Sequence, residues 1–307
     1  MADHDSTGGS HASKIEIDKP TGQTTTGHEW DGIKELNTPL PRWWLWTFYA
    51  TVAFAFVYVV LYPAIPLVNS ATRGVLGYST RAEVETAMTA AKTAQAGNLE
   101  RVATLSLDEI AADAELKRFA VAGGRSAFLV NCVQCHGSGA AGSPGYPNLN
   151  DDDWLWGGTL DDINTTISHG VRFAQDPDTR VSQMLAFGAD DILDAGQIDA
   201  VADYVLSLAG EEYDAALAEK GKPLFADNCA ACHGETGGGD RAFGAPALND
   251  AIWLYGKDKK SIVAQVHRPR HGVMPAWAHR LDPMTVKQLT LYVHSLGGGE
   301  AALAAAN

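Results

Sequence analysis

The chain has 307 residues, which leaves room for two or three small domains. Its net charge is −14 at pH 7, with 37 acidic residues against 23 basic ones. An acidic surface repels a phosphate backbone, so the composition argues against a nucleic-acid partner and favours basic partners, cations or plain solubility.

The N-terminal segment predicts an unstructured tail. Residues 1–29 are rich in Gly, Ser, Thr, Asp and His, and they hold almost no large apolar side chains. Such a stretch buries too little surface to offset the entropy of ordering it. His4, His11 and His28 lie singly in it and are interpreted as solvated residues rather than metal ligands. Together with a turn-rich collar, residues 1–42 are predicted to precede a membrane span.

One stretch predicts a membrane span. From Trp43 to Leu61 no residue is charged. A bilayer core needs about 20 apolar residues in a helix, so residues 43–62 are predicted to be one transmembrane helix. A cleavable signal peptide is disfavoured, because a long segment precedes the span and no clean cleavage site follows. Arg42 stands at the first boundary and no basic residue follows the span before Arg73, which favours an N-terminus inside.

The next segment predicts a helical connector over residues 63–122. Ser106 and Glu109 fit a capping box at the start of a helix. Gly97 and Asn98 indicate a turn between two alanine-rich helices. No residue pattern in the connector indicates chemistry, so we expect it to serve packing or spacing.

The sequence NCVQCHG contains the attachment signature of a c-type haem. Cys132 and Cys135 lie three positions apart, and His136 follows directly. Two thiols one helical turn apart can each form a thioether with one vinyl group of a porphyrin, and the imidazole then reaches the iron. Zinc sites and redox dithiols share a bare C-x-x-C, so one copy of the pattern is weak.

Repetition strengthens the haem interpretation. Cys229, Cys232 and His233 form the same motif further along the chain. The two motifs use all four cysteines, which leaves none for a disulfide. The sequence therefore predicts two covalently attached c-type haems.

The surroundings of the two motifs repeat as well, and they resemble a pair of class I cytochrome c domains. Gly124 and Phe128 correspond to Gly221 and Phe225 in helices that lead into the motifs. Each repeat closes on an amphipathic helix, ending at Leu208 and Leu296. The domains are predicted at residues 123–210 and 211–307.

The class I resemblance implies a methionine as the sixth ligand of each iron. Met184 and Met274 occupy the expected place before the closing helices, and Met284 is the runner-up for the second haem. Binding within one domain is the default, but the sequence leaves an exchange of methionines between the domains open. His/Met ligation fills both axial positions and indicates electron transfer rather than substrate chemistry.

Other polar residues near the motifs have less specific roles. His169 and His271 are interpreted as loop residues that bind backbone or a haem propionate. Arg172, Arg268 and Arg270 are candidate propionate partners, with plain surface charge as the alternative.

The run from Trp30 to Trp44, WDGIKELNTPLPRWW, makes a resemblance specific. With one span and two C-x-x-C-H motifs after it, the chain resembles the dihaem cytochrome c subunit of the cbb-type haem–copper oxidases. The resemblance implies an all-α fold, with one transmembrane helix followed by two tandem class I cytochrome c domains. It also implies a single-pass protein of the bacterial inner membrane, with a cytoplasmic N-terminus and periplasmic haem domains.

The resemblance further implies an electron relay that is not an enzyme by itself. Its partners would be a cytochrome c donor, a catalytic haem–copper subunit, a monohaem cytochrome c subunit and the lipid bilayer. A free-standing membrane-anchored shuttle is the alternative. A dihaem peroxidase needs one iron with an open position, and two well-placed methionines count against it.

Negative charge gathers in the first haem repeat. Asp151, Asp152, Asp153, Asp161 and Asp162 lie close together in the sequence. One hypothesis is a docking face for a basic cytochrome c, because opposite fields raise encounter rates. A solvated acidic surface is the equal alternative.

Overall fold

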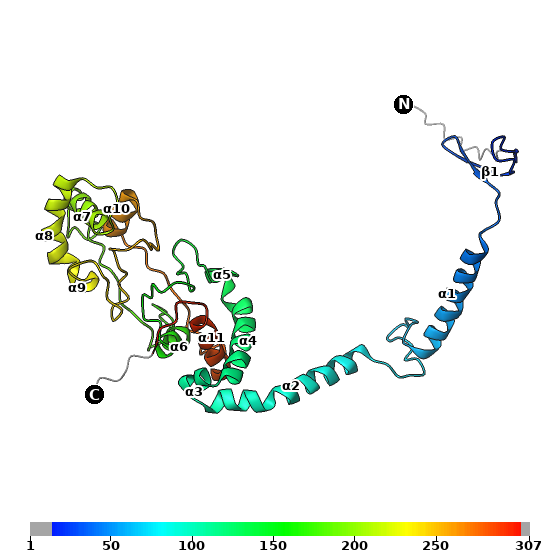
Figure 1. Cartoon of the computed structure of the whole chain (residues 1–307), viewed down its shortest axis with the longest axis horizontal. Helices are drawn as coiled ribbons and strands as arrows, with labels where there is room; N and C mark the ends of the chain where they lie inside the picture. Colours follow the sequence, from blue (N-terminus) through cyan, green and yellow to red (C-terminus); the bar gives the residue numbers. More distant parts are fainter. Residues whose placement is uncertain (1–13, 302–307) are drawn as a thin grey trace. The chain divides into compact units, whose positions relative to one another are not determined.

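The computed structural model describes residues 14–301 (Figure 1). His4 and His11 lie outside these residues, so the interpretation of both stays a prediction. The chain divides into two compact units, one up to Ala91 and one from Lys92, which are described separately below. Helices dominate the described residues, where one small two-stranded sheet is the exception. The predicted all-α class is therefore confirmed, with that sheet as a small correction.

The sheet is a hairpin in the predicted tail and collar. Strands β1 (Thr25–Trp30) and β2 (Ile33–Leu36) pair antiparallel. Asp31 and Gly32 connect them with φ of 48° and 84°, the left-handed conformation that a tight two-residue hairpin turn requires and that Asp-Gly favours. The expectation of disorder was therefore wrong for the end of the tail. It was based on composition, which does not reveal the local hairpin signal of Asp31 and Gly32.

Helix α1 (Arg42–Leu61) is the predicted span. It is the one helix of the described residues that is long and apolar enough to cross a membrane. None of its side chains is buried within the chain. The hydroxyls of Thr47 and Thr51 donate to backbone carbonyls of their own helix at 2.9 and 2.7 Å. The helix thus satisfies both of these hydroxyls internally, as a lipid environment demands.

The connector is more continuous than expected. Helix α2 (Thr80–Thr104) runs unbroken through Gly97, so the predicted turn was wrong. A helical Gly costs only about 1 kcal/mol relative to Ala, which alanine-rich neighbours offset. Helix α3 (Leu107–Ala112) begins with the predicted capping box: Glu109 N–H donates to Ser106 Oγ at 3.2 Å, and Ser106 N–H to Glu109 Oε2 at 2.8 Å.

Eight helices carry and surround the two C-x-x-C-H motifs: α4 (Ala114–Asn131), α5 (Val133–His136), α6 (Leu160–His169), α7 (Ala195–Leu208), α8 (Ala215–Asn228), α9 (Ala230–His233), α10 (Lys259–His267) and α11 (Pro283–His294). In Figure 1, α4 (green) lies beside α11 (red), and α7 lies beside α8. The helix that closes the chain therefore packs on the helix that leads into the first motif.

The crossing of α4 and α11 depends on a glycine. A Cβ at Gly124 would lie 2.0 Å from the carbonyl oxygen of Gln288, so no larger residue fits this approach. Phe128 and Tyr292 pack next to it with ring centroids 5.3 Å apart. All but 1% of the surface of Phe128 is buried, which anchors the helix pair.

The crossing of α7 and α8 repeats the same joint. A Cβ at Gly221 would lie 2.0 Å from the carbonyl oxygen of Ala200, and Tyr204 packs on Phe225 at 5.2 Å. The closing helices are thus exchanged relative to the sequence repeat. The boundaries 123–210 and 211–307 describe that repeat and stay a prediction, because helix packing follows a different grouping.

A lysine joins α10 to the α7–α8 pair. Lys259 Nζ lies 2.9 Å from Asp199 and 2.8 Å from Asp203, whose side chain is almost fully buried. The other oxygen of Asp203 accepts from the backbone N–H of Asp214, which precedes α8. These contacts raise the pKa of Lys259, chiefly through its hydrogen bond to Asp203. The three helices therefore form one packed group.

The connector ends against α11. A cluster of buried apolar residues links α2, α3, α4, α6 and α11: Val102, Ile110, Leu116, Ala120, Leu160 and Leu291. Lys287 Nζ donates to the carbonyls of Val102, Ala103 and Leu105 at 3.3, 3.0 and 2.7 Å. Its charge thereby satisfies carbonyls at the end of α2 that lack helical partners.

Candidate haem sites

The first motif lies at the junction of α4 and α5. Cys132 ends α4, and the amides of Cys135 and His136 both donate to its carbonyl, at 3.2 and 3.0 Å. The two thiols therefore sit on one turn, as attachment to one porphyrin requires. Burial raises the pKa of Cys132 to about 11.

The second motif has the same local structure. Cys229 ends α8, and the amides of Cys232 and His233 donate to its carbonyl at 3.1 and 3.0 Å. Burial again raises the pKa of the first thiol, that of Cys229, to about 11. All four cysteines lie in the described residues, and all four are free.

Each motif histidine is held by a prolyl carbonyl. Nδ1 of His136 lies 3.1 Å from the oxygen of Pro147, and Nδ1 of His233 lies 3.0 Å from that of Pro246. A carbonyl only accepts, so Nδ1 carries the proton and Nε2 keeps its lone pair. Burial lowers the pKa of both imidazoles, which favours the neutral, metal-binding form.

Met274 belongs to the surroundings of the first motif. Met274 and Cys132 both pack against the cluster formed by Phe128, Ala140, Ile163, Ile167, Val286, Leu289, Tyr292 and Val293. The backbone of Met274 pairs with Val171 through two hydrogen bonds of 2.9 and 3.0 Å. The chain thus brings a methionine of the second repeat to the first motif.

Met184 belongs to the surroundings of the second motif. It packs against the cluster that contains Phe187, Leu193, Ile198, Val201, Phe225, Cys229, Ile262 and Val266. Met284 packs instead against the connector cluster around Val102 and Leu116. The packing therefore favours an exchange of Met184 and Met274 over the pairing within each repeat that was the default.

Two of the arginines singled out in the sequence have protein partners. Arg172 donates to the carbonyls of Gly272 and Ser182 at 2.7 and 2.9 Å. Arg270 lies over the ring of Tyr255 at 4.5 Å. A propionate role for Arg172, Arg268 and Arg270 stays a prediction.

The histidines differ in their surroundings. His169 binds Asp176, while burial first and then Arg172 lower the pKa of His271. His271 also forms a hydrogen bond with the backbone of Met184, so it lies beside that methionine.

Sequence reasoning missed Arg180. Its guanidinium lies 5.2 Å from the ring centre of Trp156 and donates to the carbonyl of Asp162 at 3.3 Å. Its buried Nε has no hydrogen-bond partner among the described residues. Only its position in the loop before Met184 could have drawn attention to it.

The donor sets fit c-type haem. Each motif offers two thiols on one turn and a neutral imidazole with Nε2 available, and a thioether side chain packs on the same cluster. Sulfur of this kind and imidazole are the axial ligands of cytochromes c.

Three sequence families match successive parts of the chain. Residues 22–69 match the N-terminal domain of cytochrome oxidase-cbb3, FixP. Residues 121–209 match cytochrome c, and residues 216–293 match cytochrome C oxidase, cbb3-type, subunit III. The first match covers the hairpin and the span, and the other two cover the two C-x-x-C-H motifs.

Whole-length relatives carry corresponding names. The cbb3-type cytochrome c oxidase subunit FixP of Sinorhizobium medicae is 57% identical over 284 residues, which are 92% of this chain and 98% of that protein. The subunit CcoP of Cereibacter sphaeroides is 52% identical over 282 residues, 92% of this chain and 97% of that protein. The chain therefore belongs to the FixP/CcoP family of cbb3-type cytochrome c oxidase subunits.

Proposed function

We propose that the chain is the electron-relay subunit of a cbb3-type oxidase. It passes electrons from a cytochrome c donor through two covalently attached c-type haems towards the oxygen-reducing subunit. The observation that supports this best is the repeated site: a buried neutral histidine held by a prolyl carbonyl, with a methionine on the same apolar cluster. The match over residues 22–69 favours an oxidase subunit over a free-standing shuttle.

The proposed ligands cross between the two repeats. The first haem is held by Cys132, Cys135 and His136, with Met274 as the sixth ligand. The second haem is held by Cys229, Cys232 and His233, with Met184 as the sixth ligand. The packing of each methionine supports this assignment.

The protein groups have separate tasks at these sites. When bound, haem supplies an iron that changes oxidation state without making or breaking bonds to a substrate. The cysteines hold one edge of the porphyrin, and the prolyl carbonyls orient the imidazoles through Nδ1. The apolar clusters exclude water and favour the less charged, reduced state. With both axial positions filled, no site remains for a substrate, so the chain is not an enzyme by itself.

The proposed partners and orientation follow from the family. The relatives are named as subunits of cbb3-type cytochrome c oxidases, which supports assembly with a catalytic haem–copper subunit and a monohaem cytochrome c subunit. Helix α1 supports a single-pass place in the bacterial inner membrane. We place the N-terminus in the cytoplasm and the haem segments in the periplasm, where c-type haem is attached.

The exchange is tested in full-length protein that carries one haem. In a Cys229→Ala, Cys232→Ala background only the first haem is attached. There, Met274→Leu should abolish the charge-transfer absorption band of Met-ligated ferric haem and lower the reduction potential, while Met184→Leu should leave both unchanged. The mirror background, Cys132→Ala with Cys135→Ala, should reverse the two results.

Loss of the band on Met184→Leu in the first background would instead establish pairing within each repeat.

The relay itself is tested in membranes that contain the otherwise native oxidase. Met274→Leu and Met184→Leu should each slow oxidation of reduced cytochrome c. An unchanged rate in both variants would contradict the relay.

A further inference from the structure

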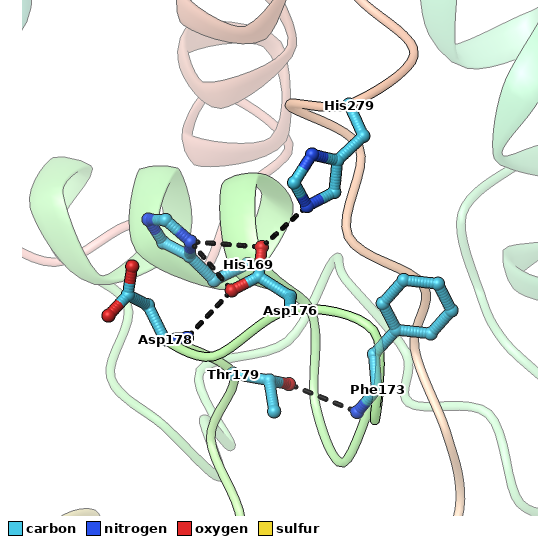
Figure 2. A network of polar contacts seen from close by, with 6 residues as sticks. All are labelled: His169, Phe173, Asp176, Asp178, Thr179 and His279. Carbon is cyan, nitrogen blue, oxygen red and sulfur yellow. Dashed lines mark hydrogen bonds and ion pairs between the residues drawn. The ribbon is translucent and has the colours of Figure 1, made fainter.

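A buried carboxylate connects two histidines beside the first haem site. Asp176 is only 4% exposed. Both of its oxygens lie 3.2 Å from Nδ1 of His169, and Oδ2 lies 3.0 Å from Nε2 of His279 (Figure 2). The backbone N–H of Asp178 donates to Oδ1 at 2.8 Å. No step of the relay uses these side chains.

The spacing of these donor atoms fits a metal ion. One ligand atom each from His169, Asp176 and Asp178 lie within 4.8 Å of one another. Zinc bonds of about 2.0–2.1 Å in a tetrahedron place neighbouring ligand atoms about 3.3 Å apart. The distance of 3.2 Å between Asp176 and Nδ1 of His169 matches that edge. Figure 2 shows the Asp178 carboxylate next to the His169 imidazole.

We propose that His169, Asp176 and Asp178 form a binding site for Zn²⁺, with His279 as an outer partner that orients Asp176. One imidazole and two carboxylates, completed by water, are a donor set that zinc accepts, whereas Ca²⁺ and Mg²⁺ require oxygen ligands. The two carboxylates balance the charge of the ion. The overall charge of −14 also attracts cations to the protein.

The state of the carboxylate suits this role. Burial alone would raise the pKa of Asp176, but the N–H of Asp178 and the two histidines outweigh it and hold the pKa below its ordinary value. The group is therefore an anion at neutral pH. His279 is more than half exposed, so solvent reaches the carboxylate of Asp176 on this side.

The site would join two segments that meet near Met274. His169 ends α6, and His279 lies between Met274 and α11. The amides of Trp277 and Ala278 already donate to the carbonyls of Ile167 and Ser168 at 3.0 and 3.2 Å. Zinc would fix the carboxylate of Asp176, to which His279 is hydrogen-bonded across the same junction.

The test is calorimetric titration of the haem-loaded, full-length protein in detergent with ZnCl₂. We expect one tight site that CaCl₂ does not fill. Asp178→Asn and His279→Gln change exposed side chains, so both variants should fold. Each should weaken that site by at least about tenfold, since even residues that only orient a metal ligand contribute about 10- to 100-fold in affinity.

His28→Gln is the matched control, since it removes an exposed histidine from the other unit, and it should leave the tight site unchanged. Zinc should also slow hydrogen exchange over residues 275–281 in wild type but not in Asp178→Asn. Equal filling by calcium, or the same zinc affinity in wild type and both variants, would overturn the proposal. Loss of the site in His28→Gln would overturn it as well.

Discussion

Val171 and Met274 are joined by two backbone hydrogen bonds of 2.9 and 3.0 Å, although they come from the two different sequence repeats. Val171 also pairs with Arg180, so three strands of irregular backbone meet at this point. The main chain of Met274 is therefore held by bonds that do not depend on its side chain. Replacing it with Leu should remove the proposed ligand without moving the loop.

The glycine at the crossing of α4 and α11 should be irreplaceable. In Gly124→Ala the new Cβ meets the carbonyl oxygen of Gln288, and we expect a loss of about 1–3 kcal/mol or more from overpacking. Gly97→Ala is the control, because nothing lies within 4 Å of its added methyl and the helix gains propensity. Thermal unfolding followed by far-ultraviolet circular dichroism measures both. A Gly124→Ala protein as stable as wild type would contradict the close approach.

Asp153 should make the protein less stable as the pH rises. Burial first, and then the nearby carboxylate of Asp250, raise the pKa of Asp153 from 3.8 to about 6. The folded state therefore binds a proton more tightly than the unfolded state, so stability falls between about pH 4 and pH 6. Asp153→Asn should raise the melting temperature at about pH 7 and change it little at about pH 4. Asp227→Asn, on the surface of α8, should show no such pH dependence.

The membrane orientation predicts which side chains an impermeant reagent reaches. The four native cysteines are expected to be held in thioethers, so Thr38→Cys or Ser70→Cys introduces a single free thiol. These exposed positions flank α1. In intact spheroplasts an impermeant maleimide should label Ser70→Cys at once and Thr38→Cys only after lysis. The opposite pattern would place the N-terminus outside.

The acidic surface of the first repeat predicts a salt-dependent encounter with the donor. Asp152 and Asp161 are exposed. Changing both to Asn should slow reduction by a basic cytochrome c at low ionic strength, because opposite fields steer the encounter. The difference should vanish near 1 M salt, where the Debye length is about 3 Å. Glu219→Gln with Asp227→Asn on α8 is the matched control in stopped-flow measurements, and equal rates for both double variants would contradict a docking face.

Local signals predicted most of the elements. The uncharged run after Trp43 marked α1, and Ser106 with Glu109 marked the start of α3. The two C-x-x-C-H motifs marked the ends of α4 and α8, because a helix was expected to lead into each motif. The hairpin was missed because its Asp31-Gly32 turn lies in a stretch that reads as polar and unstructured.

The exchange of closing helices could not be predicted from the repeat. Helices α7 and α11 are both amphipathic, and each offers a tyrosine, Tyr204 or Tyr292, to a phenylalanine of the partner helix. Either closing helix therefore suits either partner. The short connection between α7 and α8 decides the matter, since neighbours along the chain pack together when the link is brief. The pairing therefore depends on the length of this connection and not on the residues that repeat.

The packing of α4 against α11 also determines the order in which the helices find their packing partners during synthesis. Synthesis of the chain proceeds from the N-terminus, so α7 to α10 are complete while α11 is still to be made. The helices around the second motif can therefore pack on the growing polypeptide, whereas α4 lacks its packing partner until the last helix has been made. A chain that stops before Pro283 would leave α4 without its packing partner. The C-terminal helix α11 is thus the last element to be made and the one that completes the packing of α4.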